Sequence, residues 1–523
     1  MTNDFHTTCP DLAGGGLLYS ELHRIPLKLK NYNEMNKKSN LNFSRRNFIG
    51  TTAAAVTGFS IIPRNAVVGL GHIAPSDKLN IAGIGVGGKG KVNLANMPGQ
   101  NIVALCDVDW EYANPVFEKY PKAKKWKDFR EMLDKQKDID AVVIATPDHS
   151  HAFQAMTAMQ LGKHVYCQKP LTHTVWEARQ LTGAARKYNV ATQMGNEGHS
   201  RDDVRDVAEL IHAGVIGDVY EVQVTTNRPI WPQGMNRPTE EQRIPKKLDW
   251  DLFLGTAPYR PYNEAYHPWS WRAWWDYGTG ALGDMGCHVL DTPFYALNLK
   301  YPVKVQSSST LVNTESAPQA SSIEFTFPKR KNLPDCAMPE VKLVWNDGGL
   351  MPKRTPDLPE GIGLEQVNIY IGTKGKIITG NYGADYKVIL DNYKTPPKTI
   401  ERIAEHKLGG GLHEMDWVRA AKEDKDSRKE ACSNFDFAGP LTEMVLMGNL
   451  SVRLQGLKRE LEWDGDNMKF NNIGANENVQ LINSHVYKKE NMKPSFKTDR
   501  MEVNALEFAS ELIKHNYREG WGW

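Results

Sequence analysis

The stretch Leu79-Asn-Ile-Ala-Gly-Ile84, followed at once by Gly85-Val-Gly87-Gly88-Lys-Gly90, decides the fold expected for this sequence. The apolar run predicts a buried strand, and the glycines predict a tight turn that leads into a helix over about Lys91 to Met97. A second apolar run, Asn101-Ile-Val-Ala-Leu-Cys106, ends in Asp107. Strand, glycine-rich turn, helix, strand and acid in this order are typical of a dinucleotide-binding βαβ unit.

The glycines of this turn are expected to let the backbone approach a pyrophosphate, whose charge is met by N–H groups at the start of the helix. Two overlapping registers fit, Gly83-Gly85-Gly88 and Gly85-Gly87-Gly90, and the second is preferred because it leaves a longer strand ahead of the turn. Asp107 is placed to accept hydrogen bonds from ribose hydroxyls and to repel a 2′-phosphate, so NAD is favoured over NADP. The expected cofactor-binding residues of this unit are Gly85, Gly87, Gly88, Gly90 and Asp107.

Two further strand–helix units continue the pattern. Ile139 to Ala145 predicts a buried strand before Thr146-Pro-Asp-His-Ser-His151, and a helix follows from about Ala152 to Leu161. His164 to Cys167 predicts a strand that runs into Gln168-Lys169-Pro170, with a helix from Val175 to Tyr188. Ligands bind at the carboxyl edge of such parallel sheets. We therefore expect these cofactor contacts: Thr146, Pro147, His151, Lys169 and Pro170.

The second half of the chain is richer in β-strand patterns. Strands are predicted over Tyr220–Thr226, Ser322–Phe327, Val341–Trp345 and Val367–Gly372. Residues 368–379, with Thr373-Lys-Gly-Lys at the turn, predict a hairpin.

The composition is that of a soluble globular protein, with 40% apolar and 24% charged residues. The formal net charge is +2 and no basic tract resembles a nucleic-acid footprint, so we expect no nucleic-acid partner. The six cysteines include no CxxC pair, which argues against both a disulfide framework and a metal site.

The first 70 residues are interpreted as a leader. Ser44-Arg45-Arg46-Asn47-Phe48-Ile49 precedes a mildly apolar stretch that is too short to span a bilayer, and the segment 44–66 resembles a twin-arginine export signal. Met35 opens a basic start at the expected distance, so we expect it to be the initiator. This predicts export, to the periplasm, of a protein without a stable membrane span.

Four motifs in one order give the chain a family resemblance. They are the glycine-rich turn, Thr146-Pro147 with His151, Lys169-Pro170, and Asp284-Met-Gly-Cys-His288 with Asp291 after it. From about Lys78 onward the sequence resembles the Gfo/Idh/MocA family of glucose–fructose oxidoreductase, inositol dehydrogenase and their relatives. The resemblance implies an α/β Rossmann domain over 78–200. It also implies an α+β substrate and oligomerisation domain over 201–523, with a mostly antiparallel open sheet, and a homo-oligomer.

The resemblance also implies a catalytic set of Lys169, Asp284 and His288. If Asp284 begins a helix, it shares one face with His288, which could take the proton of a sugar hydroxyl. Asp284 would orient the imidazole or the substrate, and Lys169 would polarise the hydroxyl. Gln168 stands where the family usually has Glu, which leaves the electrostatic setting of Lys169 open.

Several other residues are candidates for contact with the substrate. Glu197 and His199 follow the last strand of the first domain, and Asp291 follows the catalytic motif. A run of aromatics crowds the approach to Asp284, and we expect one or two of them to line the sugar pocket. The run comprises Trp231, Trp269, Trp271, Trp274, Trp275 and Tyr277, of which Trp274 and Trp275 are named as the candidates.

The expected function is hydride transfer between a nicotinamide and the hydroxyl of a sugar, glycoside or polyol. Export favours a tightly bound cofactor, because no NAD pool recycles it outside the cytoplasm. One alternative is a glycosidase that oxidises C3 transiently, eliminates the substituent and reduces the ring again. Another is a non-catalytic sugar-binding protein, which ranks lower because Lys169 and His288 are both present.

Overall fold

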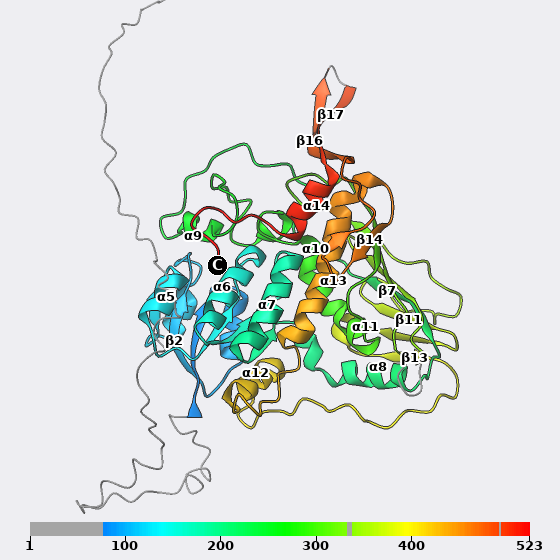
Figure 1. Ribbon diagram of the computed structural model, residues 1–523, viewed down its shortest axis with the longest axis horizontal. Helices are drawn as coiled ribbons and strands as arrows, with labels where there is room; N and C mark the ends of the chain where they lie inside the picture. Colours follow the sequence, from blue (N-terminus) through cyan, green and yellow to red (C-terminus); the bar gives the residue numbers. More distant parts are fainter. Residues whose placement is uncertain (1–76, 332–336, 491–492) are drawn as a thin grey trace, which may run out of the picture. The chain divides into compact units, whose positions relative to one another are not determined.

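The computed structural model describes residues 77–331, 337–490 and 493–523 (Figure 1). The expected leader, with Met35 and the twin-arginine motif, lies outside these residues. Within the described ranges, no helix combines the length and the apolar character needed to cross a membrane.

The first sheet confirms the expected Rossmann architecture. Its strands are β1 (Asn80–Ile84), β2 (Asn101–Cys106), β3 (Lys124–Trp126), β4 (Ala141–Ile144), β5 (His164–Cys167) and β6 (Thr192–Met194). They pair in parallel in the order β3-β2-β1-β4-β5-β6. The intervening helices are α3 (Lys89–Ala95), α4 (Asn114–Lys119), α5 (Phe129–Lys135), α6 (Asp148–Gln160) and α7 (Val175–Tyr188).

Strand β1 occupies the point where the strand order reverses, because it pairs with β2 on one side and β4 on the other. The glycine-rich turn leaves the carboxyl end of β1, which is where open parallel sheets bind ligands. All four residues of β4 are buried, as expected for a strand covered on both faces. The sequence did not predict β3 and α5, which are short and rich in charge.

The second sheet is mixed and mostly antiparallel, which confirms the second part of the expected fold. Its strands are β7 (Val219–Thr225), β8 (Lys304–Ser309), β9 (Ser321–Phe327), β10 (Val341–Asn346), β11 (Asn368–Gly372), β12 (Lys376–Thr379), β13 (Lys387–Ile389), β14 (Leu461–Asp464) and β15 (Lys469–Phe470). Their order is β13-β12-β11-β7-β10-β9-β8-β14-β15. β7 and β10 are parallel, and β11 and β12 form the predicted hairpin.

The helices of the second half join the two sheets into one core. They are α8 (Asp202–His212), α9 (Trp250–Leu254), α10 (Gly280–Val289), α11 (Asp291–Ala296), α12 (Leu412–Lys422), α13 (Phe435–Leu454) and α14 (Ala505–Ile513). Helix α13 packs on α7 and β6 of the first sheet and on β8 and β9 of the second. One apolar cluster therefore contains both Ile144 of β4 and Phe325 of β9.

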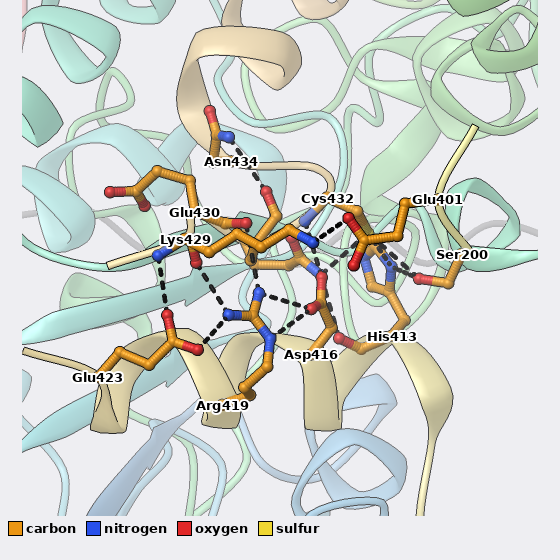
Figure 2. A network of polar contacts seen from close by, with 12 residues as sticks. Ser200, Glu401, His413, Asp416, Arg419, Glu423, Lys429, Glu430, Cys432 and Asn434 are labelled. Atoms are coloured by element: carbon orange, nitrogen blue, oxygen red, sulfur yellow. Dashed lines mark hydrogen bonds and ion pairs between the residues drawn. The ribbon is translucent and has the colours of Figure 1, made fainter. Parts of the chain in front are cut away.

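Helix α12 returns to the first sheet and packs beside β5 and β6. Figure 2 shows the polar network that fixes it there. The Asp416 carboxylate accepts from the Arg419 guanidinium at 2.8 Å and from the Cys432 N–H at 2.7 Å. His413 Nδ1 lies 2.6 Å from the Ser200 hydroxyl. His413 and Asp416 are buried, so this network anchors α12. It thereby also fixes the position of Glu414, which follows His413 on the same helix.

Strands β16 (Asn478–Glu490) and β17 (Lys493–Asn504) form a separate two-stranded ribbon that extends beyond α14 (Figure 1). After α14 the chain runs back toward α6 and α9 of the main body.

Candidate active site

A cleft of about 620 Å³ opens at the carboxyl ends of β1, β2, β4 and β5 and is completed by residues of the second half. Ten of the residues predicted for the site line it together. They are Gly85, Gly87, Gly88, Asp107, Thr146, Pro147, Lys169, Glu197, Asp284 and His288. The volume lies in the range that small-molecule and cofactor sites occupy.

The three candidate catalytic residues meet at the inner end of this cleft. Lys169 follows β5, whereas Asp284 and His288 lie one helical turn apart on α10. The Lys169 ammonium donates to the main-chain oxygen of Asp284 at 2.6 Å and to its carboxylate at 2.8 Å. The contact joins residues 115 positions apart, so it exists only because α10 packs against the edge of the first sheet.

The charges around Asp284 keep it ionised. Burial raises the pKa of Asp284, but the nearby charges of Lys169 and Arg272 outweigh that effect and hold the pKa well below its usual range. The Arg272 guanidinium lies 3.1 Å from the same carboxylate oxygen as Lys169. Two cations thus contact the Asp284 carboxylate at this end of the cleft.

His288 is held in the neutral form. Burial and the charge of Lys169 lower the pKa of His288 well below 6.5, although Asp284 acts in the opposite direction. Its ring packs edge-on against Tyr382, with the ring centroids 4.8 Å apart. Among the described residues, His288 Nδ1 has no hydrogen-bond partner. The neutral imidazole has a nitrogen lone pair that can accept a proton, and its lowered pKa makes it a weaker base than a free histidine.

The cofactor wall is built around the glycine-rich turn. Gly85 has φ +76°, and a Cβ at this residue would lie 2.7 Å from the main-chain oxygen of Ala145. The Asp107 carboxylate accepts from the Gly87 N–H and from the Asp109 N–H, each at 3.0 Å. The Tyr112 ring lies close to Gly87 and Gly88, and the glycine backbone beside the buried Asp107 carboxylate fits the pyrophosphate and ribose of a dinucleotide.

Three of the predicted cofactor residues lie behind this wall, not on it. Gly90 packs on the Gly85 carbonyl, which a Cβ at Gly90 would approach to 2.4 Å. The His151 ring nitrogens lie 2.8 Å from the main-chain oxygens of Pro170 and Thr146. His151 thus ties the ends of β4 and β5 together, and neither His151 nor Pro170 lines the cleft.

Some of the predicted substrate residues also line the cleft, whereas others lie behind its surface. Glu197 faces the cleft and pairs with Lys89 at 2.5 Å. His199 and Asp291 instead form a buried pair, with His199 Nδ1 2.9 Å from the Asp291 carboxylate and Asn196 donating to the same group at 2.8 Å. This pair connects the segment after β6 to the start of α11 and does not line the cleft.

The structure does not bring Trp274 and Trp275 into the lining. Both are buried, and their indole N–H groups donate to the carbonyls of Ala265 and Asn313. Other aromatics of the same run line the cleft in their place, namely Trp231, Trp269 and Trp271. In an irregular loop, the side chains that face the cleft do not recur at a fixed spacing. The sequence therefore could not predict which tryptophans of this run line the cleft.

The lining residues that the sequence interpretation missed include Arg228, Arg272, Tyr382 and Trp521. The Arg272 guanidinium is stacked between Trp269 and Trp271, 4.4 Å and 4.3 Å from their ring centroids. An arginine among tryptophans is a cation–π signal that could have marked it. Tyr382 and Trp521 reach the cleft from segments far along the chain, and no local pattern indicates them.

Contacts that lead to Glu414 of α12 explain why position 168 carries a glutamine. Its amide N–H donates to Asn93 Oδ1 at 3.0 Å, and the Asn93 amide donates in turn to Glu414 at 2.9 Å. All three side chains are buried. A carboxylate at position 168 could not donate to Asn93 and would lie in the same network as the Glu414 carboxylate.

Comparison with known proteins agrees with this geometry. Residues 78–196 match the NAD-binding Rossmann fold of the Gfo/Idh/MocA oxidoreductase family, and residues 200–331 match the C-terminal alpha/beta domain of the same family. The WlbA dehydrogenase of Bordetella pertussis, solved with NADH and UDP-GlcNAcA, is similar in fold at TM-score 0.50 and 17% identity, over 74% of this chain and 99% of that one.

Two curated relatives are similar over part of their length. D-glucoside 3-dehydrogenase of Escherichia coli (strain K12) is 28% identical over 208 residues, which is 40% of this chain and 50% of that protein. Glycosyl hydrolase family 109 protein 1 of Shewanella sp. (strain ANA-3) is 30% identical over 208 residues, 34% of this chain and 44% of that protein. The chain thus spans about half the length of the curated relatives it matches. Through residues 78–331 it belongs to the Gfo/Idh/MocA family of oxidoreductases and carries that family's NAD-binding Rossmann domain.

Proposed function

We propose that this protein oxidises and reduces the hydroxyl-bearing carbon of a sugar, glycoside or polyol with a tightly held NAD. The observation that carries the proposal is the contact between Lys169 and Asp284, beside the neutral His288, in the cleft that the glycine-rich turn forms. When bound, NAD supplies the hydride acceptor and donor. Asp107 favours NAD over NADP because its carboxylate repels a 2′-phosphate.

His288 is the proposed general base. Its neutral imidazole takes the proton of the reacting hydroxyl as the carbon is oxidised, and returns it in the reverse direction. Lys169 and Arg272 stabilise the negative charge that develops on the substrate oxygen, because both cations line the cleft beside Asp284. Asp284 holds the Lys169 ammonium in place.

The substrate end of the cleft suits a sugar. Trp269, which is 51% exposed, offers an apolar face on which a pyranose ring can lie, and the largely buried Trp231 and Trp271 also belong to the lining. Arg228 and Glu197 offer polar groups for its hydroxyls.

We also propose that the protein is exported by the twin-arginine pathway, on the motif that includes Arg45 and Arg46. A cofactor that leaves the enzyme outside the cytoplasm would be lost, so the reaction should be redox-neutral over a full cycle or depend on a partner that reoxidises NADH. Replacing both arginines by lysine should stop export.

A second candidate is a glycosidase that oxidises C3 transiently, eliminates the glycosidic substituent and reduces the ring again. The similarity to glycosyl hydrolase family 109 proteins favours it. The proposed roles of Lys169 and His288 are the same, because the cycle begins and ends with oxidation and reduction of an alcohol carbon.

The test is product analysis on the purified protein. Denaturation should release bound NAD(H), and a panel of glycosides and polyols should yield either a keto product or a free aglycone. The matched control is Lys169→Ala, which should retain the dinucleotide and form neither product. A keto product identifies the oxidoreductase, and an aglycone without net NADH identifies the glycosidase. Absence of any bound or bindable nucleotide contradicts both.

A further inference from the structure

The segment that follows α14, residues 514–523, is here named the return segment. It runs from α14 back to the Rossmann half (Figure 1). Arg518 fixes its path, since its guanidinium donates to the main-chain oxygen of Gly255 at 3.1 Å and pairs with Asp251. The Arg518 N–H also donates to the Thr256 carbonyl at 3.1 Å. These contacts tie the return segment to the end of α9.

Trp521 of the return segment is part of the cleft lining. Its ring is stacked by the Arg130 guanidinium, 4.2 Å from the ring centroid, and meets Phe153 of α6 edge-on at 5.7 Å. Arg130 is itself oriented by Asp128, whose carboxylate it binds at 2.6 Å. Trp521 is thus held from two sides.

Further contacts hold the return segment on the outside of the Rossmann half. Trp523 stacks on Trp176 of α7, with the ring centroids 5.6 Å apart and the planes 9° from parallel. The Tyr517 hydroxyl donates to the buried carboxylate of Glu177. The segment is therefore packed before and after Trp521, which fixes where this ring meets the cleft.

Trp521 lies at the end of the cleft next to β2 and β3, where the adenosine of a bound dinucleotide is expected. The Asp107 N–H donates to the Trp126 carbonyl at 3.1 Å, so the end of β2, with its ribose-binding carboxylate, adjoins the end of β3. Asp128 and Arg130 follow β3 directly, and Trp521 lies on Arg130. An aromatic ring beside a base-binding site offers a stacking surface.

We propose that the return segment is part of the cofactor site, where Trp521 closes the adenosine end of the cleft and slows the release of NAD. The inference rests on the proposed function, which requires a cofactor that stays bound through turnover. It assigns that retention to a ring more than 400 positions along the chain from the glycine-rich turn.

The test compares Trp521→Ala, Trp521→Phe and the wild type. Tyr487→Ala removes an exposed aromatic from the distant ribbon and is the matched control. The readouts are the dissociation rate of NAD+, followed by dilution into excess competitor, and the affinities for ADP-ribose and nicotinamide mononucleotide by calorimetry. We expect Trp521→Ala to release NAD+ about ten times faster and to bind ADP-ribose about ten times more weakly.

The same variant should bind nicotinamide mononucleotide as the wild type does, and Trp521→Phe should recover most of the slow release. An unchanged NAD+ dissociation rate in folded Trp521→Ala overturns the inference and leaves the proposed function standing. An equal loss of affinity for both half-ligands also overturns it, because the role would then be general stability. If the wild type binds no NAD+, the proposed function itself fails.

Discussion

The two walls of the cleft differ in how far apart their residues lie along the chain. On the cofactor wall, Gly85, Gly87 and Asp107 belong to one βαβ unit, and the Gly87 main-chain N–H donates a hydrogen bond to the Asp107 carboxylate. The substrate wall joins three distant segments, because Lys169 binds Asp284 of α10 and Tyr382 packs on His288 of the same helix. The first wall depends on backbone geometry and the second on domain packing, so damage to each should affect a different step.

The largest effect is expected on the substrate wall. Lys169→Ala should lower the rate of substrate oxidation about 10³-fold, because it removes the cation beside the reacting oxygen, and should change NAD+ affinity little. Single-turnover kinetics and NAD+ titration measure the two effects. Lys163→Ala, which loses a lysine bound to the Ile139 carbonyl, is the control. Equal losses of rate and of NAD+ affinity would contradict the separation of the walls.

The next effect belongs to the cofactor wall. Gly85→Ala should weaken NAD+ binding about 100-fold, since the new Cβ meets the Ala145 carbonyl at a residue with φ +76°. Gly162→Ala is a matched control, because Gly162 has φ +71° and open space around the new Cβ. Both variants carry backbone strain, but only the first should lose NAD+ in an equilibrium titration. Similar NAD+ affinities in the two variants would show that the turn does not hold the cofactor.

The third effect is on the stability of the fold and concerns the buried hydrogen-bond network of Gln168, Asn93 and Glu414. Gln168→Glu should destabilise the fold by about 2 kcal/mol at neutral pH, because Asn93 would lose a donor and a second carboxylate would join that of Glu414. In the double variant Gln168→Glu/Glu414→Gln, the amide at position 414 can donate to Asn93 and the carboxylate at position 168 can accept from it. This variant should recover at least half of the lost free energy of unfolding. Urea unfolding measures both. A single variant as stable as the wild type would remove this explanation of Gln168.

The smallest effect is a pH dependence of the cofactor wall. Burial raises the pKa of Asp107 to about 6, so its carboxyl group becomes protonated as the pH falls through that value. Ribose hydroxyls donate to the carboxylate, so bound NAD+ lowers this pKa, and affinity decreases with falling pH. We expect about tenfold weaker binding at pH 5 than at pH 7. Asp107→Asn should bind weakly at both pH values, and an equally steep profile in that variant would exclude Asp107 as the titrating group.

The same difference between the walls governs what the sequence could predict. The Rossmann sheet, the β11–β12 hairpin and the contact of Gly87 with Asp107 follow from local runs and spacing. The cleft positions of Trp269 and Trp271, in place of Trp274 and Trp275, depend on an irregular loop without a period. Trp521 reaches the cleft only because the return segment crosses α6 and α7, which is a tertiary contact.

The sequence also assigned to the site three residues that do not line the cleft, namely His151, His199 and Asp291. Each lies beside a predicted motif, and each is polar, but buried partners hold them behind the cleft. Sequence spacing identified the segments that form the site, whereas burial decided which side chains face it.

The central claim is that the bound dinucleotide exchanges hydride with a sugar carbon in this cleft. The most direct measurement is mass spectrometry of the bound cofactor after incubation with glycosides that carry deuterium on their ring carbons. Hydride transfer in this cleft predicts deuterium in the dinucleotide of the wild type and far less, over the same time, in Lys169→Ala. A protein that holds NAD but acquires no deuterium from any glycoside or polyol would contradict it.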